Sequence, residues 1–165
     1  MKILIIQLLL LIALSCPGQT LFGDKCIGKW EGTLNIFSRG VLKDSVTVRH
    51  TVEKLSPTSW TWKTEYLSAN MPMVKDYILR TPDPYLNKYI TDEGGGLELT
   101  DYLFGNKLYS VFETHEVLLT STYELIGDTL IFEVTSGKKE SITHPEVVTY
   151  ATSNLQRAVF KRTSR

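Results

Sequence analysis

Hydrophobic and polar residues alternate along most of the chain after about residue 28. In the sequence "SVTVRHTVEKL", Val46, Val48, His50 and Val52 fall on one face, and polar residues occupy the positions between them. This period of two is typical of a β-strand with one buried face, and no stretch shows a sustained period of 3.6. Strand-like stretches cover residues 29–37, 45–55, 58–67, 74–80, 85–91, 96–104, 107–114, 117–126, 129–136, 147–151 and 155–162.

Short turn sequences separate these stretches and indicate how they connect. Gly105-Asn106 and Gly127-Asp128 each lie between two alternating runs, which is a strong local signal for a β-hairpin. Consecutive hairpins place neighbouring strands side by side and antiparallel. We therefore predict an all-β fold, an antiparallel up-and-down barrel of about 8–10 strands that closes and removes its free edges. An open, curved sheet is the alternative.

The first residues differ from the rest. Lys2 precedes an apolar run of about a dozen residues, from Ile3 to Leu14, which is shorter than the ~20 needed to span a membrane. We expect residues 1–19 to be a signal peptide and residues 20–165 to form one domain that is exported, periplasmic or secreted. In the alternative, "IALSC" is a bacterial lipobox, Cys16 carries a lipid and the protein is anchored at the cell envelope.

Composition and motifs exclude several functions. Eighteen basic residues balance 18 acidic ones, so no overall charge attracts nucleic acid, and we expect no nucleic-acid partner. The chain has no GxSxG or HExxH motif and only three histidines. We therefore predict no catalytic residue, no metal ligand and no cofactor, in a monomer that is not an enzyme. An enzymatic alternative would require His50 to titrate near neutral pH beside a carboxylate.

The start of the first strand carries a motif. Gly28 and Trp30, separated by one residue, resemble the opening signature of the lipocalins and fatty-acid-binding proteins, the calycin superfamily. The resemblance implies a barrel whose end is closed by Trp30, with a basic residue of the last strand packed over the indole ring. Arg157 is the first choice for that residue and Arg162 the second.

Aromatic residues on the inward faces predict where a ligand would bind. Large rings with a polar atom suit a pocket for a mainly apolar molecule, although the same rings can simply fill a barrel. Our first hypothesis is a barrel that binds a small hydrophobic or amphipathic ligand in its interior. The second is a filled barrel that serves as a structural or protein-interaction module of the cell envelope. The candidate cavity residues are His50, Trp60, Trp62, Tyr66, Tyr77, Phe112 and Tyr123.

Overall fold

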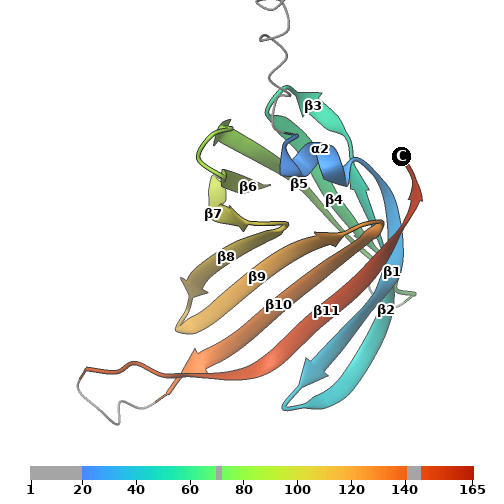
Figure 1. Cartoon of the computed structure of the whole chain (residues 1–165). Helices are drawn as coiled ribbons and strands as arrows, with labels where there is room; N and C mark the ends of the chain where they lie inside the picture. The colour runs from blue at the N-terminus through green and yellow to red at the C-terminus, as the bar shows by residue number, and fades with distance from the viewer. Residues whose placement is uncertain (1–19, 70–71, 141–145) are drawn as a thin grey trace, which may run out of the picture.

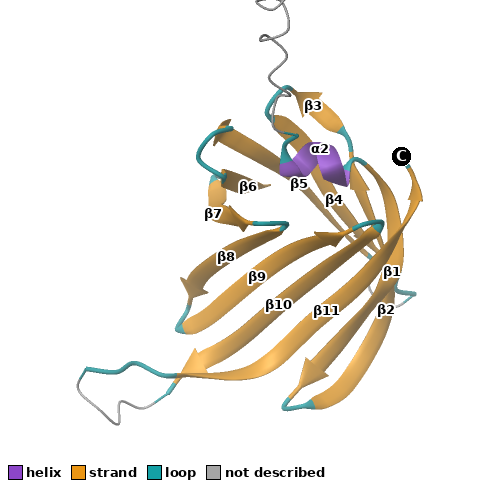
Figure 2. Ribbon diagram, in the orientation of Figure 1, coloured by secondary structure: helices purple, strands orange, loops and turns teal. Residues whose placement is uncertain are grey.

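The computed structural model describes residues 20–69, 72–140 and 146–165, and it shows one short helix and eleven strands in these parts (Figure 1 and Figure 2). The predicted signal peptide, with Cys16, lies outside the described residues. The elements are α2 (Phe22–Cys26), β1 (Gly28–Ser38), β2 (Val41–Val52), β3 (Lys54–Ser56), β4 (Ser59–Tyr66), β5 (Met73–Asp83), β6 (Lys88–Gly94), β7 (Leu97–Phe104), β8 (Lys107–Thr114), β9 (Val117–Ile126), β10 (Thr129–Lys139) and β11 (Tyr150–Ser164).

Ten of the described strands close into an antiparallel barrel. The sheet order runs β2-β1-β11-β10-β9-β8-β7-β6-β5-β4, and a further pairing between β2 and β4 joins the two ends, while β3 pairs only with β4. Every pairing joins strands that are consecutive along this part of the chain, except that of β1 with β11 and that of β2 with β4, which passes over β3. The predicted antiparallel barrel is therefore confirmed, and the open sheet is wrong.

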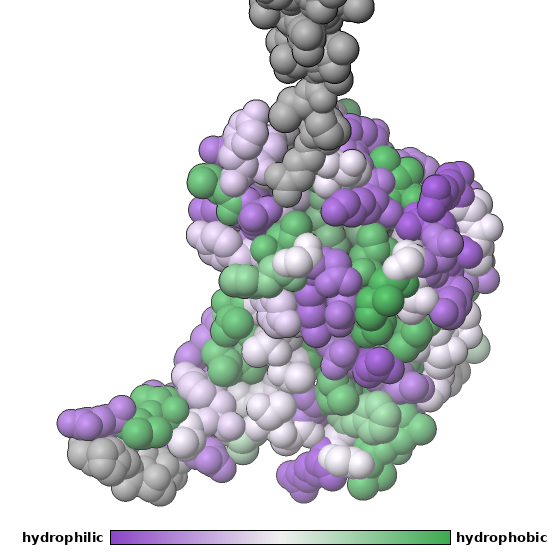
Figure 3. Space-filling model, viewed as in Figure 1, coloured by the Kyte–Doolittle hydropathy of each residue, from purple (hydrophilic) through white to green (hydrophobic). Residues whose placement is uncertain are grey.

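The alternation in the sequence explains which side of the wall each residue occupies. In β4, Trp60, Trp62 and Thr64 are buried, while the residues between them are partly exposed. In β2, Val48, His50 and Val52 are likewise buried. Outward-facing positions give the outer surface its mixture of hydrophobic and hydrophilic residues (Figure 3). Burial of one face of each strand stabilises the fold, at roughly 25 cal/mol per Å² of apolar surface.

Helix α2 covers one end of the barrel, where β4 begins and β11 ends (Figure 1). Phe22 and Cys26 of this helix are buried, and the backbone N–H of Phe22 donates a hydrogen bond of 3.0 Å to the hydroxyl of Tyr89. The sequence pattern did not predict this helix, since five residues are too few for a 3.6-residue period to show. We call this the closed end and the opposite one the open end.

The wall of the barrel is interrupted on one side. β7 and β8 pair through four residue pairs, from Asp101–Ser110 to Phe104–Lys107, all near the closed end. Beyond Asp101 and Ser110 the two strands pair only with their other neighbours, β6 and β9. Fully buried rings, among them Phe22, Trp30 and Trp60, fill the interior at the closed end.

Among the described residues, no helix is long and apolar enough to cross a membrane. The described helix has only five residues and is part of the barrel's closed end.

Candidate functional site

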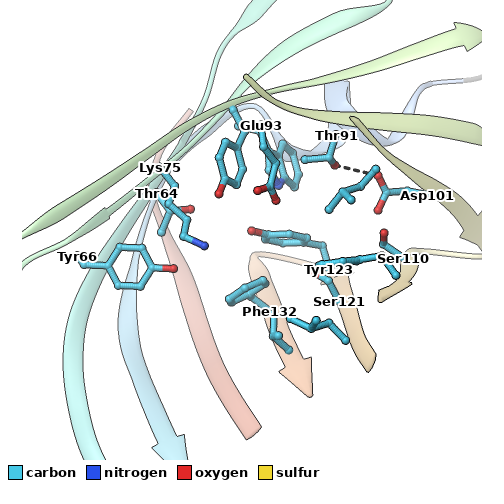
Figure 4. A pocket seen from close by; sticks show the side chains of 16 residues that line it. Thr64, Tyr66, Lys75, Thr91, Glu93, Asp101, Ser110, Ser121, Tyr123 and Phe132 are labelled. Carbon is cyan, nitrogen blue, oxygen red and sulfur yellow. Dashed lines mark hydrogen bonds between the residues drawn. The ribbon is translucent and has the colours of Figure 1, made fainter. Parts of the chain in front are cut away.

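A cavity of about 260 Å³ lies inside the barrel on the side of the β7–β8 split (Figure 4). Its walls come from β4 through β10, because each of these strands turns alternate side chains inward. At its outer rim, Tyr66 and Lys75 also line a second hollow of about 310 Å³ near β1, β2 and β11. The cavity volume is slightly below the roughly 300–1,000 Å³ of typical small-molecule sites, so it suits a small ligand.

The cavity lining combines three kinds of side chain. Aliphatic residues and hydroxyls fill the spaces between the aromatic rings, and three charged groups point inward. The aromatic residues are Trp62, Tyr66, Tyr77, Phe112, Tyr123 and Phe132; the charged ones are Lys75, Glu93 and Asp101; the others are Thr64, Thr91, Leu99, Ser110, Leu119, Ser121 and Val134.

Tyr123 lies at the centre of the aromatic group. Its ring centroid is 5.0 Å from that of Trp62, in an edge-to-face arrangement, and 4.7 Å from that of Phe132. Such contacts hold the rings in fixed positions. The indole Nε1 of Trp62 is buried and lacks a well-formed hydrogen bond with a described residue, although the Tyr123 hydroxyl is near enough to interact with it.

In the structure, five of the seven predicted cavity residues line this space: Trp62, Tyr66, Tyr77, Phe112 and Tyr123. The other two, His50 and Trp60, share their inward face but lie closer to the closed end, outside the cavity lining. The Trp60 indole donates a hydrogen bond of 2.9 Å to Asp24 and packs against Gly23 of α2. Trp60 therefore belongs to the closed end.

His50 is part of the packed layer below the cavity. Its side chain is 0% exposed, its Nδ1 lies 2.9 Å from the Thr64 hydroxyl, and its ring meets the edge of Trp62 at 4.7 Å. Burial lowers the pKa of His50 to about 3. An imidazole that stays neutral above this pH does not meet the requirement of the enzymatic alternative, which needed titration near neutrality.

The closed end contains Trp30 as the resemblance implied, but the basic residue over it is Arg162. The Arg162 guanidinium lies 3.9 Å from the Trp30 ring centroid and donates hydrogen bonds to the backbone carbonyls of Ile27 and, at 2.9 Å, Lys25. The first choice, Arg157, is wrong: its guanidinium lies 3.6 Å from Glu133 and is partly exposed.

The register of β11 explains this correction. Arg162 pairs directly with Trp30, whereas Arg157 pairs with Asn35, further along β1 toward the open end. Gly28, at the start of β1, has φ 134°, and a Cβ there would meet the carbonyl oxygen of Ser164. A residue with a side chain would be strained at this position, so glycine permits the close approach of β1 and β11.

The charged groups of the cavity were not predicted from the sequence. Thr91 donates a hydrogen bond of 2.8 Å to the carboxylate of Asp101, which is 6% exposed (Figure 4). Burial raises the pKa of Asp101 from 3.8 to about 6, while the Thr91 hydrogen bonds lower it. Burial, followed by the charge of Glu93, raises the pKa of Tyr77. The Lys75 ammonium lies 5.7 Å from the Tyr77 ring centroid.

One signal in the sequence would have identified Asp101. It occupies the same face of its strand as Leu99 and Leu103, so an acidic residue interrupts an apolar series. Within the described parts of the chain, no three His, Cys, Asp or Glu side chains gather in a way that could hold a metal ion.

Comparison with known proteins identifies the fold. No protein-family model matches the sequence, and no curated protein matches it in sequence. The S-type phycobiliprotein lyase CPES from Guillardia theta superposes with a TM-score of 0.62 at 8% identity, covering 87% of this chain and 92% of that one. Rv2717c from M. tuberculosis superposes with a TM-score of 0.53 at 13% identity, covering 85% of this chain and 94% of that one.

The fluorescent protein UnaG superposes with a TM-score of 0.47 at 14% identity, covering 85% of this chain and 98% of that one. At these identities the likeness concerns the fold alone. The closed antiparallel ring of ten strands and the superposition on the phycobiliprotein lyase CPES confirm the barrel fold that the resemblance at Gly28 and Trp30 implied.

Proposed function

We propose that this protein binds a small, mainly apolar molecule with a polar group inside its barrel. The observation that carries the proposal is the cavity of about 260 Å³, with six aromatic residues and three charged ones in its lining. An apolar pocket with a few inward polar groups is the usual form of a small-molecule site, since the apolar surface supplies affinity and the polar groups fix orientation.

The alternative, a filled barrel acting as a structural or interaction module, fits this interior less well. Close packing is the rule in protein cores, and a space of this size lined by polar as well as apolar side chains leaves contacts unmade. The indole N–H of Trp62 is buried and has no well-formed hydrogen bond with a described residue, and weak pairing of a buried donor costs free energy. A ligand that fills the cavity would supply both kinds of contact.

The test is binding of N-phenyl-1-naphthylamine, a neutral, apolar fluorescent probe, to the wild type and two variants. Ser121→Trp places an indole ring in the cavity, and we expect it to weaken probe binding at least about tenfold, which corresponds to 1.4 kcal/mol. Thr122→Trp is the matched control, because successive residues of a strand point to opposite faces and Thr122 does not line the cavity. Thermal unfolding checks that both variants fold. Equal probe affinity in wild type and Ser121→Trp would refute interior binding.

We also propose that the protein is exported, with residues 1–19 removed or with a lipid on Cys16. The support is the short apolar run after Lys2, followed by polar sequence. Intact-mass measurement of the protein purified from its native cells tests this. We expect a mass that lacks the first 19 residues or so, or one that begins at Cys16 and carries acyl chains. A mass that includes the whole N-terminal run would refute export by this signal.

A further inference from the structure

The acidic groups of the cavity lack a cationic partner. Asp101 and Glu93 both line the cavity, and neither forms an ion pair with a described residue. Their polar contacts are neutral groups: the hydroxyl and the backbone N–H of Thr91 donate to Asp101, and the hydroxyl of Tyr77 donates to Glu93. Burying a carboxylate costs free energy unless an opposite charge or sufficient hydrogen bonds compensate it. The β6–β7 wall therefore presents two carboxylates to the interior that have no cationic partner among the described residues.

The one cation among the described cavity-lining residues is placed at the rim. Lys75 lies on β5 opposite Thr64, and it lines both the cavity and the adjoining hollow that contains Asp44. Figure 4 shows its side chain entering from the β4–β5 side, while Asp101 lies across the cavity on β7. With both carboxylates ionised, the two acids outnumber the lysine, and the net charge of the lining is negative.

Aromatic faces complete a site suited to a positive charge. Tyr77, Phe112 and Tyr123 line the same cavity as the two acids, and the π-face of an aromatic ring attracts a cation by about 0.5–2 kcal/mol. A charged ligand would exchange water for carboxylate oxygens on one side and ring faces on the other. The remaining lining, which includes Leu99, Leu119 and Val134, suits an apolar body.

We infer that the ligand is a small organic amine in its protonated form, bound with its ammonium group toward Asp101 and Glu93 and its apolar body against the aromatic rings. This inference rests on the proposed function. The amine keeps its proton, and no covalent step is involved. The cavity volume limits the body to one or two rings or a short chain.

Three compounds of nearly equal size and different charge test the inference by isothermal titration calorimetry at pH 7.5. They are tryptamine, which is cationic, tryptophol, which is neutral, and indole-3-acetate, which is anionic. Asp101 is ionised at this pH, since its pKa is about 6. We expect tryptamine to bind at least about tenfold more tightly than the other two, because a charge-assisted hydrogen bond is stronger than a neutral one.

Isosteric variants assign the preference to individual residues. Asp101→Asn and Glu93→Gln should each weaken tryptamine binding while leaving tryptophol binding unchanged. The control is Glu98→Gln, on the outer side of β7, where Glu98 pairs at 2.6 Å with Arg80. This variant should bind tryptamine as the wild type does. Lys75→Gln should leave tryptamine binding unchanged or strengthen it.

The other outcomes overturn the inference. If indole-3-acetate binds most tightly and Lys75→Gln abolishes its binding, the ligand is an anion held at the rim. If the three compounds bind equally, or none displaces N-phenyl-1-naphthylamine, charge does not select the ligand. In each of these cases the proposal of interior binding is tested separately, by the affinity of the neutral probe for the wild type and for Ser121→Trp.

Discussion

Replacing Arg162 by alanine is expected to lower the free energy of unfolding by about 3 kcal/mol. The guanidinium lies over the Trp30 ring at 3.9 Å, and its side chain is only 8% exposed. A desolvated cation–π contact contributes about 2 kcal/mol, and hydrogen bonds from a charged donor about 1.5–3 kcal/mol each, with the exposed bond to the Lys25 carbonyl at the lower end. These contributions are not additive, since they depend on one placement of one group. Urea-induced unfolding, followed by tryptophan fluorescence, measures the loss.

Two further variants separate geometry from charge. Arg162→Lys keeps the positive charge but loses the planar fork that reaches the carbonyls of Lys25 and Ile27, so we expect little recovery of stability. Arg157→Ala removes only a partly exposed ion pair with Glu133 and should cost under about 1 kcal/mol. Equal losses for Arg162→Ala and Arg157→Ala would show that closure of the barrel end does not depend on Arg162.

Acidification is expected to destabilise the protein through His50. The unfolded chain binds a proton at this residue below its ordinary pKa of 6.5, whereas the folded state does not until pH falls to about 3. The contribution of neutral His50 is thus fully present above pH 6.5. Below that value, this contribution to the free energy of unfolding falls by about 1.4 kcal/mol per pH unit. From pH 6.5 to pH 4 the loss is on the order of 3 kcal/mol.

Asp101 changes the stability of the protein in the opposite direction over nearly the same pH range. Its folded-state pKa of about 6 exceeds the ordinary 3.8, so the folded protein retains a proton that the unfolded chain releases. This contribution is fully present below pH 3.8 and is lost as pH rises to about 6, again on the order of 3 kcal/mol. Between pH 4 and pH 6 the two residues therefore largely offset each other in the wild type.

Single variants reveal the two contributions. Relative to the wild type, His50→Gln should gain stability as pH falls from 6.5 to 4, and Asp101→Asn should lose it over pH 6 to 4. Urea unfolding at a series of pH values gives both differences. If the difference between His50→Gln and the wild type does not vary with pH, the imidazole is not held neutral by burial.

The sequence allowed the fold to be predicted more fully than the site. Alternation in β2 and β4 identified the inward faces correctly, and glycine turns such as Gly105-Asn106 placed the hairpins. Alternation does not predict how far along the barrel axis a residue lies, because that position depends on the register between strands. Trp60 and Trp62 are equivalent by alternation, yet only Trp62 lines the cavity. The choice of Arg157 was wrong for a different reason: it alternates with the buried residues Ala158 and Phe160 and so faces outward, whereas Arg162 lies on their face.

The charged cavity residues were missed for another reason. Glu93 precedes a glycine turn, where acidic residues commonly bond to the local backbone. Asp92 does so, by accepting a hydrogen bond of 2.9 Å from the N–H of Gly94. Glu93, the next residue along β6, faces the opposite way and lines the cavity. Only the assignment of inward positions strand by strand separates the two carboxylates.

The pairing of β1 with β11 also fixes the order in which the barrel can be completed. All other ladders join consecutive strands or, for β2 and β4, strands separated only by the three residues of β3, so they can form as a growing series of local pairings. Closure of the wall needs β11, and the contacts of Arg162 with Lys25 and Ile27 span 137 and 135 residues. A chain cut before Tyr150 would expose β1 and β10 as free edges, which are sites of aggregation. The last 16 residues thus determine whether the other strands form a closed barrel or an open sheet that is prone to aggregation.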